Sequence, residues 1–156
     1  MNLRDYLIDQ EGKDWCRLLA PWADLLPASF TVWLVNRFGD VFAVCDDGTV
    51  CRLDIGSGTF VHVAGSREEF MELSNVQEDA DDLLMIPFVD QCVAAGMILS
   101  PNQCYGYKIP PFLGGEYDLE NFIRIGIAEH YAFHGDLHQQ TKGFPDRTRA
   151  KLVITR

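Results

Sequence analysis

Apolar side chains recur every three or four positions near the start of the chain and then change to the shorter period of strands. Over residues 3–25 they form one stripe, which predicts a helix, and Pro21 predicts the start of a second short helix. Over residues 30–63 four short β-branched and aromatic runs, separated by glycine turns, predict an antiparallel meander. Arg52 and Asp54 alternate with apolar neighbours, so we expect one wet face on the third strand. The first two strands are apolar on both faces, and we expect the N-terminal helices to cover them.

Helices are predicted after the meander. Ser66 and Glu69 have the spacing of a capping box, which predicts a helix start. A second helix is predicted from about residue 78 to 95, and Pro87 should kink or split it. Gly96 is placed to end that helix as the residue after its C-cap.

The last third of the chain combines glycine and proline with short apolar runs. Strands are predicted over residues 103–109 and 122–127, a helix over 128–142, and a returning edge strand over 151–155. The expected fold class is therefore α+β, an antiparallel meander sheet flanked by helices, with a C-terminal strand–helix–strand portion.

We expect residues 1–156 to form a single compact domain, and we leave open a subdivision into 1–75 and 76–156. The hydrophobic content of 47% is that of a globular protein. The five cysteines form no C-x-x-C pair, and neither a signal peptide nor a membrane span is visible. We therefore expect a cytoplasmic protein with reduced thiols.

The formal net charge is −10, and residues 66–90 contain eight acids and one base. Such a chain should repel nucleic acid and anionic membranes, so we expect neither as a partner. A basic protein or a cation is the expected charged partner, with simple solubility as the alternative. The candidate partner-binding acids are Glu68, Glu69, Glu72, Glu78, Asp79, Asp81 and Asp82.

The first three of these acids lie in the opening turns of a predicted helix, where the helix dipole favours carboxylates. The other four have no such explanation, although a solvated face remains an alternative for all seven. A second candidate contact region is the segment around the glycine pair Gly114-Gly115, which either positions Glu116 or forms a tight turn. Its candidate residues are Tyr105, Tyr107, Glu116 and Tyr117.

Three histidines, His130, His134 and His138, recur at four-residue spacing on the last predicted helix. They share their sector with apolar residues, which predicts neutral, hydrogen-bonded imidazoles in or near the core. A metal- or histidine-dependent enzyme built on this stripe and Glu116 is the alternative, but no fourth ligand is apparent. We expect no cofactor and no stoichiometric zinc.

A longer pattern is carried by PNQCYGYKIPPFLGGEYDLENFIRI, residues 101–125, and by QQTKGFPD, residues 139–146. It resembles the C-terminal domain of a bacterial type VI secretion immunity family, whose named member neutralises a DNase effector. The matching positions are Gly106, Tyr107, Pro110, Leu113, Gly114, Gly115, Glu116 and Pro145. The meander resembles an N-terminal domain related to one in aspartyl-tRNA synthetases and tRNA amidotransferases.

The resemblance implies an immunity protein: a small cytosolic binder, without catalysis or cofactor, that occludes a cognate effector. Nuclease toxins present basic clefts, which an acidic surface would suit. A housekeeping scaffold without a toxin partner stays open beside the enzyme alternative.

Overall fold

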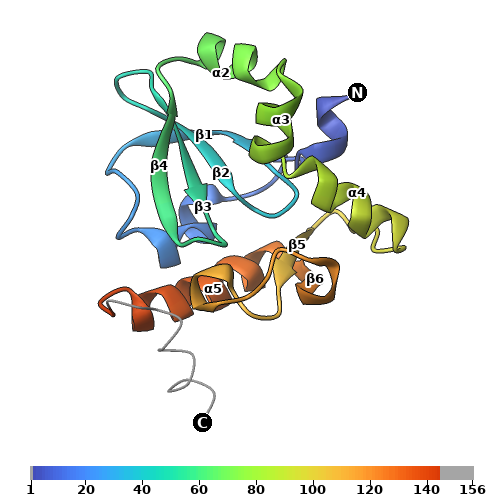
Figure 1. Ribbon diagram of the computed structural model, residues 1–156. Coiled ribbons are helices and arrows are strands. Elements are labelled where there is room, and N and C mark those ends of the chain that lie inside the picture. The colour runs from blue at the N-terminus through green and yellow to red at the C-terminus, as the bar shows by residue number, and fades with distance from the viewer. Residues whose placement is uncertain (1, 145–156) are drawn as a thin grey trace.

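The computed structural model describes residues 2–144, which form an α+β fold of two antiparallel sheets and surrounding helices (Figure 1). The 3-10 helices are η1 (Leu3–Tyr6), η2 (Ala20–Trp22), η3 (Pro111–Leu113) and η4 (Leu119–Asn121). The α-helices are α1 (Trp15–Leu18), α2 (Arg67–Ser74), α3 (Gln77–Leu83), α4 (Ile86–Ala94) and α5 (Ile127–Thr141). The strands are β1 (Phe30–Val35), β2 (Val41–Cys45), β3 (Val50–Asp54), β4 (Thr59–Ala64), β5 (Gln103–Tyr107) and β6 (Phe122–Gly126).

The predicted meander is confirmed as a four-stranded sheet in the order β1-β2-β3-β4, with every neighbouring pair antiparallel. Its three turns contain Gly39, Gly48 and Gly58 at φ values of 82°, 86° and 67°. Glycine adopts this left-handed region without the steric penalty of a Cβ atom, so the turn residues fix where each strand ends.

The two faces of this sheet are covered by different parts of the chain. On β2, Val41 and Ala43 belong to a core cluster with Trp22 of η2 and Tyr131 of α5. Phe42 and its neighbours on the other face pack with α2 and α3 (Figure 1). The expectation that the first two strands are covered is confirmed, but the N-terminal segment supplies only part of each cover.

The prediction of helix over residues 3–25, interrupted only at Pro21, is wrong for the part before α1. Leu7 forms an antiparallel bridge with Asn36, and Gly12 has a φ of 75°, so the chain leaves the helical path between η1 and α1. The predicted helix start near Pro21 is confirmed by η2. Apolar spacing alone did not reveal that long-range pairing would compete with a helix here.

The helices after the meander begin and end at the predicted signals. The Ser66 side chain accepts a hydrogen bond from the Glu69 backbone N–H at 3.1 Å. The predicted second helix is split into α3 and α4 at Met85, a residue with a φ of 51°, and Pro87 lies in the first turn of α4. Gly96, at a φ of 84°, ends α4 as predicted.

The C-terminal part pairs β5 with β6 and continues into α5, which confirms two strands and one helix of the predicted portion. Backbone hydrogen bonds tie it to the meander turns: Tyr105 N–H donates to the Arg37 carbonyl, and Phe112 N–H to the Gly56 carbonyl, both at 2.8 Å. The strand predicted over residues 151–155 lies outside the described residues.

The expectation of a wet face on β3 is wrong for Arg52, which is buried. Helix α3 lies over this face, and the arginine meets a carboxylate that comes from the first turn of the meander. A buried charge needs a paired charge and hydrogen bonds, and both are supplied by residues distant in sequence.

Candidate functional site

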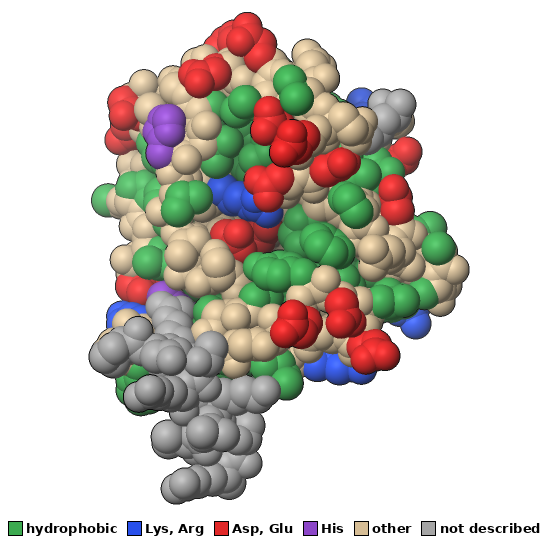
Figure 2. Space-filling model, viewed as in Figure 1, with side chains coloured by type: hydrophobic (Ala, Val, Ile, Leu, Met, Phe, Trp, Pro, Cys, Tyr) green, Lys and Arg blue, Asp and Glu red, His purple; other side chains and the backbone are tan. Residues whose placement is uncertain are grey.

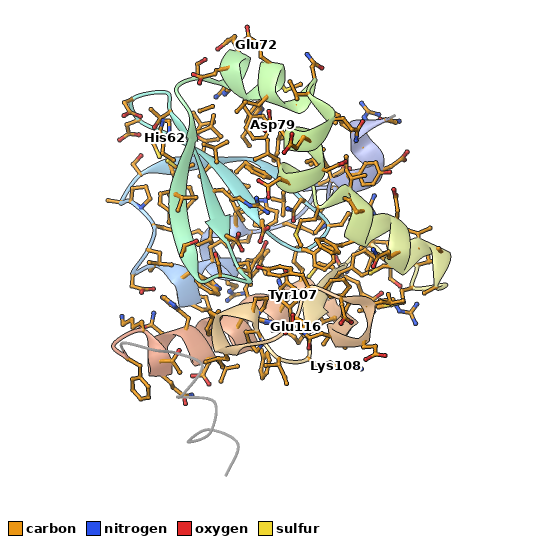
Figure 3. The ribbon with its side chains drawn as sticks, in the orientation of Figure 1. His62, Glu72, Asp79, Tyr107, Lys108 and Glu116 are labelled. Atoms are coloured by element: carbon orange, nitrogen blue, oxygen red, sulfur yellow. The ribbon has the colours of Figure 1, made fainter. Side chains whose placement is uncertain are left out.

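The residues predicted to bind a partner lie in two regions, one on α2 and α3 and one beside β5 (Figure 3). Figure 3 places Glu72 and Asp79 on the upper helices and Tyr107 and Glu116 in the lower half of the molecule. The acids are exposed, except for the half-buried Asp79 and Asp81. Their exposure agrees with a solvent-facing surface.

Helix α3 begins at Gln77, so Glu78 and Asp79 lie in its first turn. The helix dipole favours carboxylates there, an explanation that the sequence had offered only for the acids of α2. Asp81 and Asp82 lie further along α3, where that effect has fallen off. These two are therefore the acids that the helix itself explains least.

The second predicted group does not form one surface. Tyr105 and Tyr107 are 2% and 1% exposed, and the Tyr105 hydroxyl donates to the Met97 carbonyl at 2.6 Å. Neither ring is available to a partner on the described surface. Glu116 is exposed, and Tyr117 is 40% exposed.

A groove of about 330 Å³ brings part of the two predicted groups together. We call it the Arg52 groove, and its lining residues are Arg52, Asp54, Asp81, Asp82, Met85, Phe88 and Tyr117. Figure 2 shows a hollow on this face with basic atoms at its floor, acidic side chains above and below, and hydrophobic side chains to one side. The groove therefore combines carboxylates with an aromatic wall.

A second hollow, of about 260 Å³, adjoins the first because both contain Arg52 and Asp82. Its other lining residues come from β4 and from the acidic helices, and include His62, Leu73 and Asp79. Asp82 thus lies on the rim between two depressions of the same acidic face.

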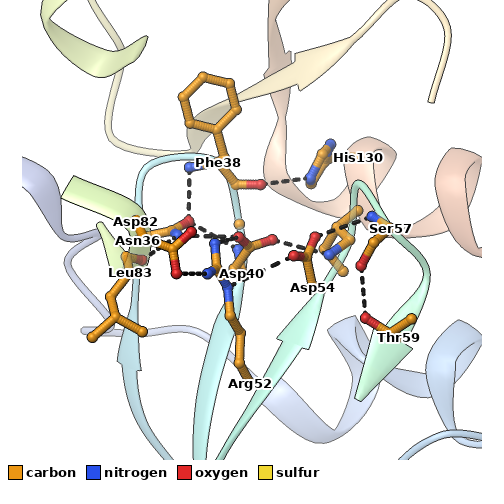
Figure 4. Close-up of polar contacts among 12 residues, drawn as sticks. Asn36, Phe38, Asp40, Arg52, Asp54, Ser57, Thr59, Asp82, Leu83 and His130 are labelled. Atoms are coloured by element: carbon orange, nitrogen blue, oxygen red, sulfur yellow. Dashed lines mark hydrogen bonds and ion pairs between the residues drawn. The ribbon is translucent and has the colours of Figure 1, made fainter. Parts of the chain in front are cut away.

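The floor of the groove rests on a buried polar network (Figure 4). Arg52 Nη2 donates to Asp40 Oδ2 at 2.7 Å, and the Ile55 backbone N–H donates to Asp40 Oδ1 at 2.9 Å. Asn36 Nδ2 donates to the same Asp40 carboxylate at 3.2 Å and to the Leu83 carbonyl at 3.0 Å. Asp40 and Asn36 together therefore link the β1–β2 turn, strand β3 and the end of α3.

The charges around Arg52 are unequally compensated. Its Nε lies 3.9 Å from Asp54 and its Nη1 lies 3.6 Å from Asp82. Burial works to lower the pKa of Arg52, but the Asp40 and Asp54 carboxylates outweigh burial and raise it. Burial and the charge of Asp40 raise the pKa of Asp54 to about 6, because the more distant arginine offsets them only in part.

The three histidines are buried, as the apolar sector of their helix predicted. His130 Nε2 lies 2.9 Å from the Phe38 carbonyl and His134 Nδ1 lies 3.1 Å from the His130 carbonyl, so each of these nitrogens donates a proton. Burial lowers the pKa of His130 to about 4 and that of His134 to about 3. His138 Nε2 pairs with Asp24 at 2.8 Å.

These imidazoles join parts of the fold and do not line the Arg52 groove. The His130 ring lies against Gly39 and Gly106, where an added Cβ would come within 2.8 Å of its atoms. Gly135 gives η2 close access to α5, since a Cβ there would lie 2.6 Å from Pro21. Over residues 2–144 no group of three or more His, Cys, Asp or Glu side chains is arranged to hold a metal ion.

Sequence reasoning missed the buried network beneath the groove. A single arginine among the apolar strands was the available signal, because a central strand accepts a guanidinium only beside a carboxylate. Its partner, Asp40, directly follows the turn glycine Gly39, a place where an exposed aspartate is common.

Comparison with known protein families gives a match over the second half of the described chain. Residues 64–138 match the family model described as T6SS immunity protein Tdi1, C-terminal. This confirms the resemblance seen in the sequence for that stretch, which includes α2, α3 and the whole predicted acidic set. No curated protein matches the chain. None of the helices within residues 2–144 has the length and hydrophobicity required to cross a bilayer.

Proposed function

Because residues 64–138 match the family model described as T6SS immunity protein Tdi1, C-terminal, we propose that the chain binds and neutralises a cognate secreted toxin. The family match is the observation that carries this proposal. Neutralisation by an immunity protein is a binding event that leaves the toxin unable to reach its substrate.

The contact face that we propose is the acidic surface of α2 and α3 together with the Arg52 groove. The segment from residue 66 to 90 contains eight acids and one base, and most of its acids are exposed. Concentrated charge steers an oppositely charged partner and raises its association rate. A basic toxin surface is therefore the partner chemistry that we propose.

A nuclease toxin fits this chemistry, because an enzyme that binds nucleic acid carries a basic cleft. An acidic protein placed over such a cleft would block the substrate directly. We propose that the encounter takes place in the cytoplasm, where a nuclease finds its substrate.

The buried histidines do not favour a catalytic role as a second function. His130 and His134 are fully buried, and burial keeps their pKa values well below neutral pH. A general base must approach the proton that it removes, and these imidazoles are packed within the core.

Co-expression with a candidate toxin, chosen as a secreted protein encoded by a neighbouring gene, tests the proposal. We expect the toxin, made harmless by a catalytic mutation, to co-elute with the protein and to bind with a dissociation constant at or below the micromolar range. We also expect the active toxin to be tolerated only when the protein is present. An unrelated basic protein of similar size is the control for general charge attraction. Absence of both a complex and protection would refute the proposed function.

A further inference from the structure

We propose that the Arg52 groove is the receptor for one arginine side chain of the effector. This inference rests on the proposed function and assigns the anchor point within the acidic face. The groove lies between β3, α3, α4 and the loop that carries Tyr117, so it is shaped by four separate elements.

The apolar side of the groove matches the flat face of a guanidinium. Phe88 and Tyr117 both line it, with ring centroids 6.0 Å apart, and Met85 lines it beside them. Tyr117 also meets the buried Tyr107 ring edge-on at 5.8 Å, which holds it in place. Guanidinium groups stack on such rings, whereas a lysine ammonium has no plane to offer.

The charged side of the groove has room for one more cation. Asp40 is buried and directly bonded to Arg52, so it balances that arginine. Asp54, Asp81 and Asp82 then leave the groove with a negative balance. Asp54 lies 3.9 Å from its nearest cation, and Asp82 lies 3.6 Å from its own, both beyond good hydrogen-bond distance. An incoming guanidinium would supply the missing donors, while a phosphate or carboxylate would be repelled.

Arg52 holds the charged side of the groove in place without neutralising it. Its side chain is 9% exposed and its Nη2 donates to Asp40 at 2.7 Å, so the guanidinium is fixed at the floor. Its Nη1 lies 3.6 Å from Asp82 and its Nε lies 3.9 Å from Asp54, so Arg52 is not within hydrogen-bond distance of either carboxylate. The expected occupant is therefore an arginine side chain whose guanidinium donates to Asp54 and Asp82 and stacks on the aromatic wall.

Titration with N-acetyl-arginine amide tests the groove without the toxin. We expect saturable NMR shifts of the Met85 methyl and the Phe88 and Tyr117 rings at millimolar concentrations. N-acetyl-citrulline amide has nearly the same shape without the charge, and should produce no such shifts. Asp82→Asn should weaken the arginine response at least threefold, and Glu11→Gln, an equal charge change outside the groove lining, should leave it unchanged. Equal responses to both amides, or no response at these residues, would overturn the proposal.

Binding to the toxin separates a failure of the groove from a failure of the proposed function. Asp81→Asn/Asp82→Asn should raise the dissociation rate at least tenfold, while Glu11→Gln/Asp136→Asn, with the same loss of charge at exposed positions outside the proposed contact face, should change it less than threefold. Equal effects of the two pairs would overturn the groove and leave the proposed function standing. If the toxin does not bind the unmodified protein, the proposed function is overturned. The amide titration would still show whether the groove binds arginine.

Discussion

The carboxylates around Arg52 fall into two groups, one exposed to solvent on α3 and one buried beneath it. Asp82 on α3 is 79% exposed in its side chain, whereas the Asp40 side chain below it is 1% exposed, and Arg52 contacts both. Exposed carboxylates interact weakly with the fold, so their charge is free to act on a partner. A buried carboxylate paired with a buried guanidinium is instead tied to the fold, since either group alone is strongly unfavourable. The same residue type thus serves recognition in one place and architecture in the other.

Removal of Asp40 should have the largest effect on stability. Asp40→Ala leaves the Arg52 charge buried without its closest partner and removes the acceptor of the Ile55 N–H. We expect a loss of about 3–5 kcal/mol in the free energy of unfolding, measured by denaturant titration. Asp82→Asn is the matched control and should change it by no more than about 0.5 kcal/mol. A loss below about 1 kcal/mol for Asp40→Ala would mean that the network does not hold the turns.

The buried histidines should make the fold sensitive to acid. The pKa values of His130 and His134 are lowered to about 4 and 3, so the unfolded chain, with ordinary values near 6.5, binds more protons. Their contribution is therefore complete above pH 6.5 and is lost as the pH falls towards about 4. Each group should contribute at most about 1.4 kcal/mol per pH unit in that window.

His134→Phe tests this acid sensitivity, because the Nδ1–H of His134 bonds only to a carbonyl of its own helix. The free energy of unfolding should fall less steeply between pH 6.5 and 4 in this variant. The exposed His62 offers a control, and His62→Asn should keep the parental slope. If the free energy of unfolding falls equally steeply between pH 6.5 and 4 in the parent and in both variants, His134 is not a neutral buried group.

Asp54 should affect the free energy of unfolding less than the buried histidines do, and with the opposite dependence on pH. Its folded pKa is raised to about 6 from a model-compound value of 3.8, so its protonated form favours the folded state. That contribution is complete below about pH 4 and is lost as the pH rises through 6. Asp54→Asn should therefore stabilise the protein by about 1 kcal/mol at pH 8 and by little at pH 4. Asp46→Asn, at an exposed turn, should not show this difference. Equal effects at both pH values would contradict the raised pKa.

The features that the sequence predicted well are those set by local chemistry. Gly48 and Gly96 adopt the left-handed conformations expected of a hairpin and a helix end, and Ser66 caps α2. The histidine stripe faces the core because its neighbours on the helix are apolar. In each case the deciding interaction lies within a few residues.

The features that the sequence did not predict depend on contacts between distant residues. Leu7 pairs with Asn36 and so interrupts the predicted N-terminal helix. Arg52 can be buried because its guanidinium pairs with Asp40, twelve positions earlier in the chain. Tyr105, predicted as a contact residue, is drawn into the core by packing against Phe38 at a ring-centroid distance of 5.4 Å. Periodicity along one segment carries no information about such partners.

The most direct test of the account is the association rate of the protein with its toxin, measured at several salt concentrations. The test variant is Glu78→Gln/Asp79→Asn/Asp81→Asn/Asp82→Asn, which neutralises α3 and should still fold because these groups reach solvent. We expect its association rate constant at low salt to fall about tenfold, and we expect salt to slow the parent protein towards the same value. An unchanged rate with unchanged salt dependence would show that the acids of α3 only solvate the surface.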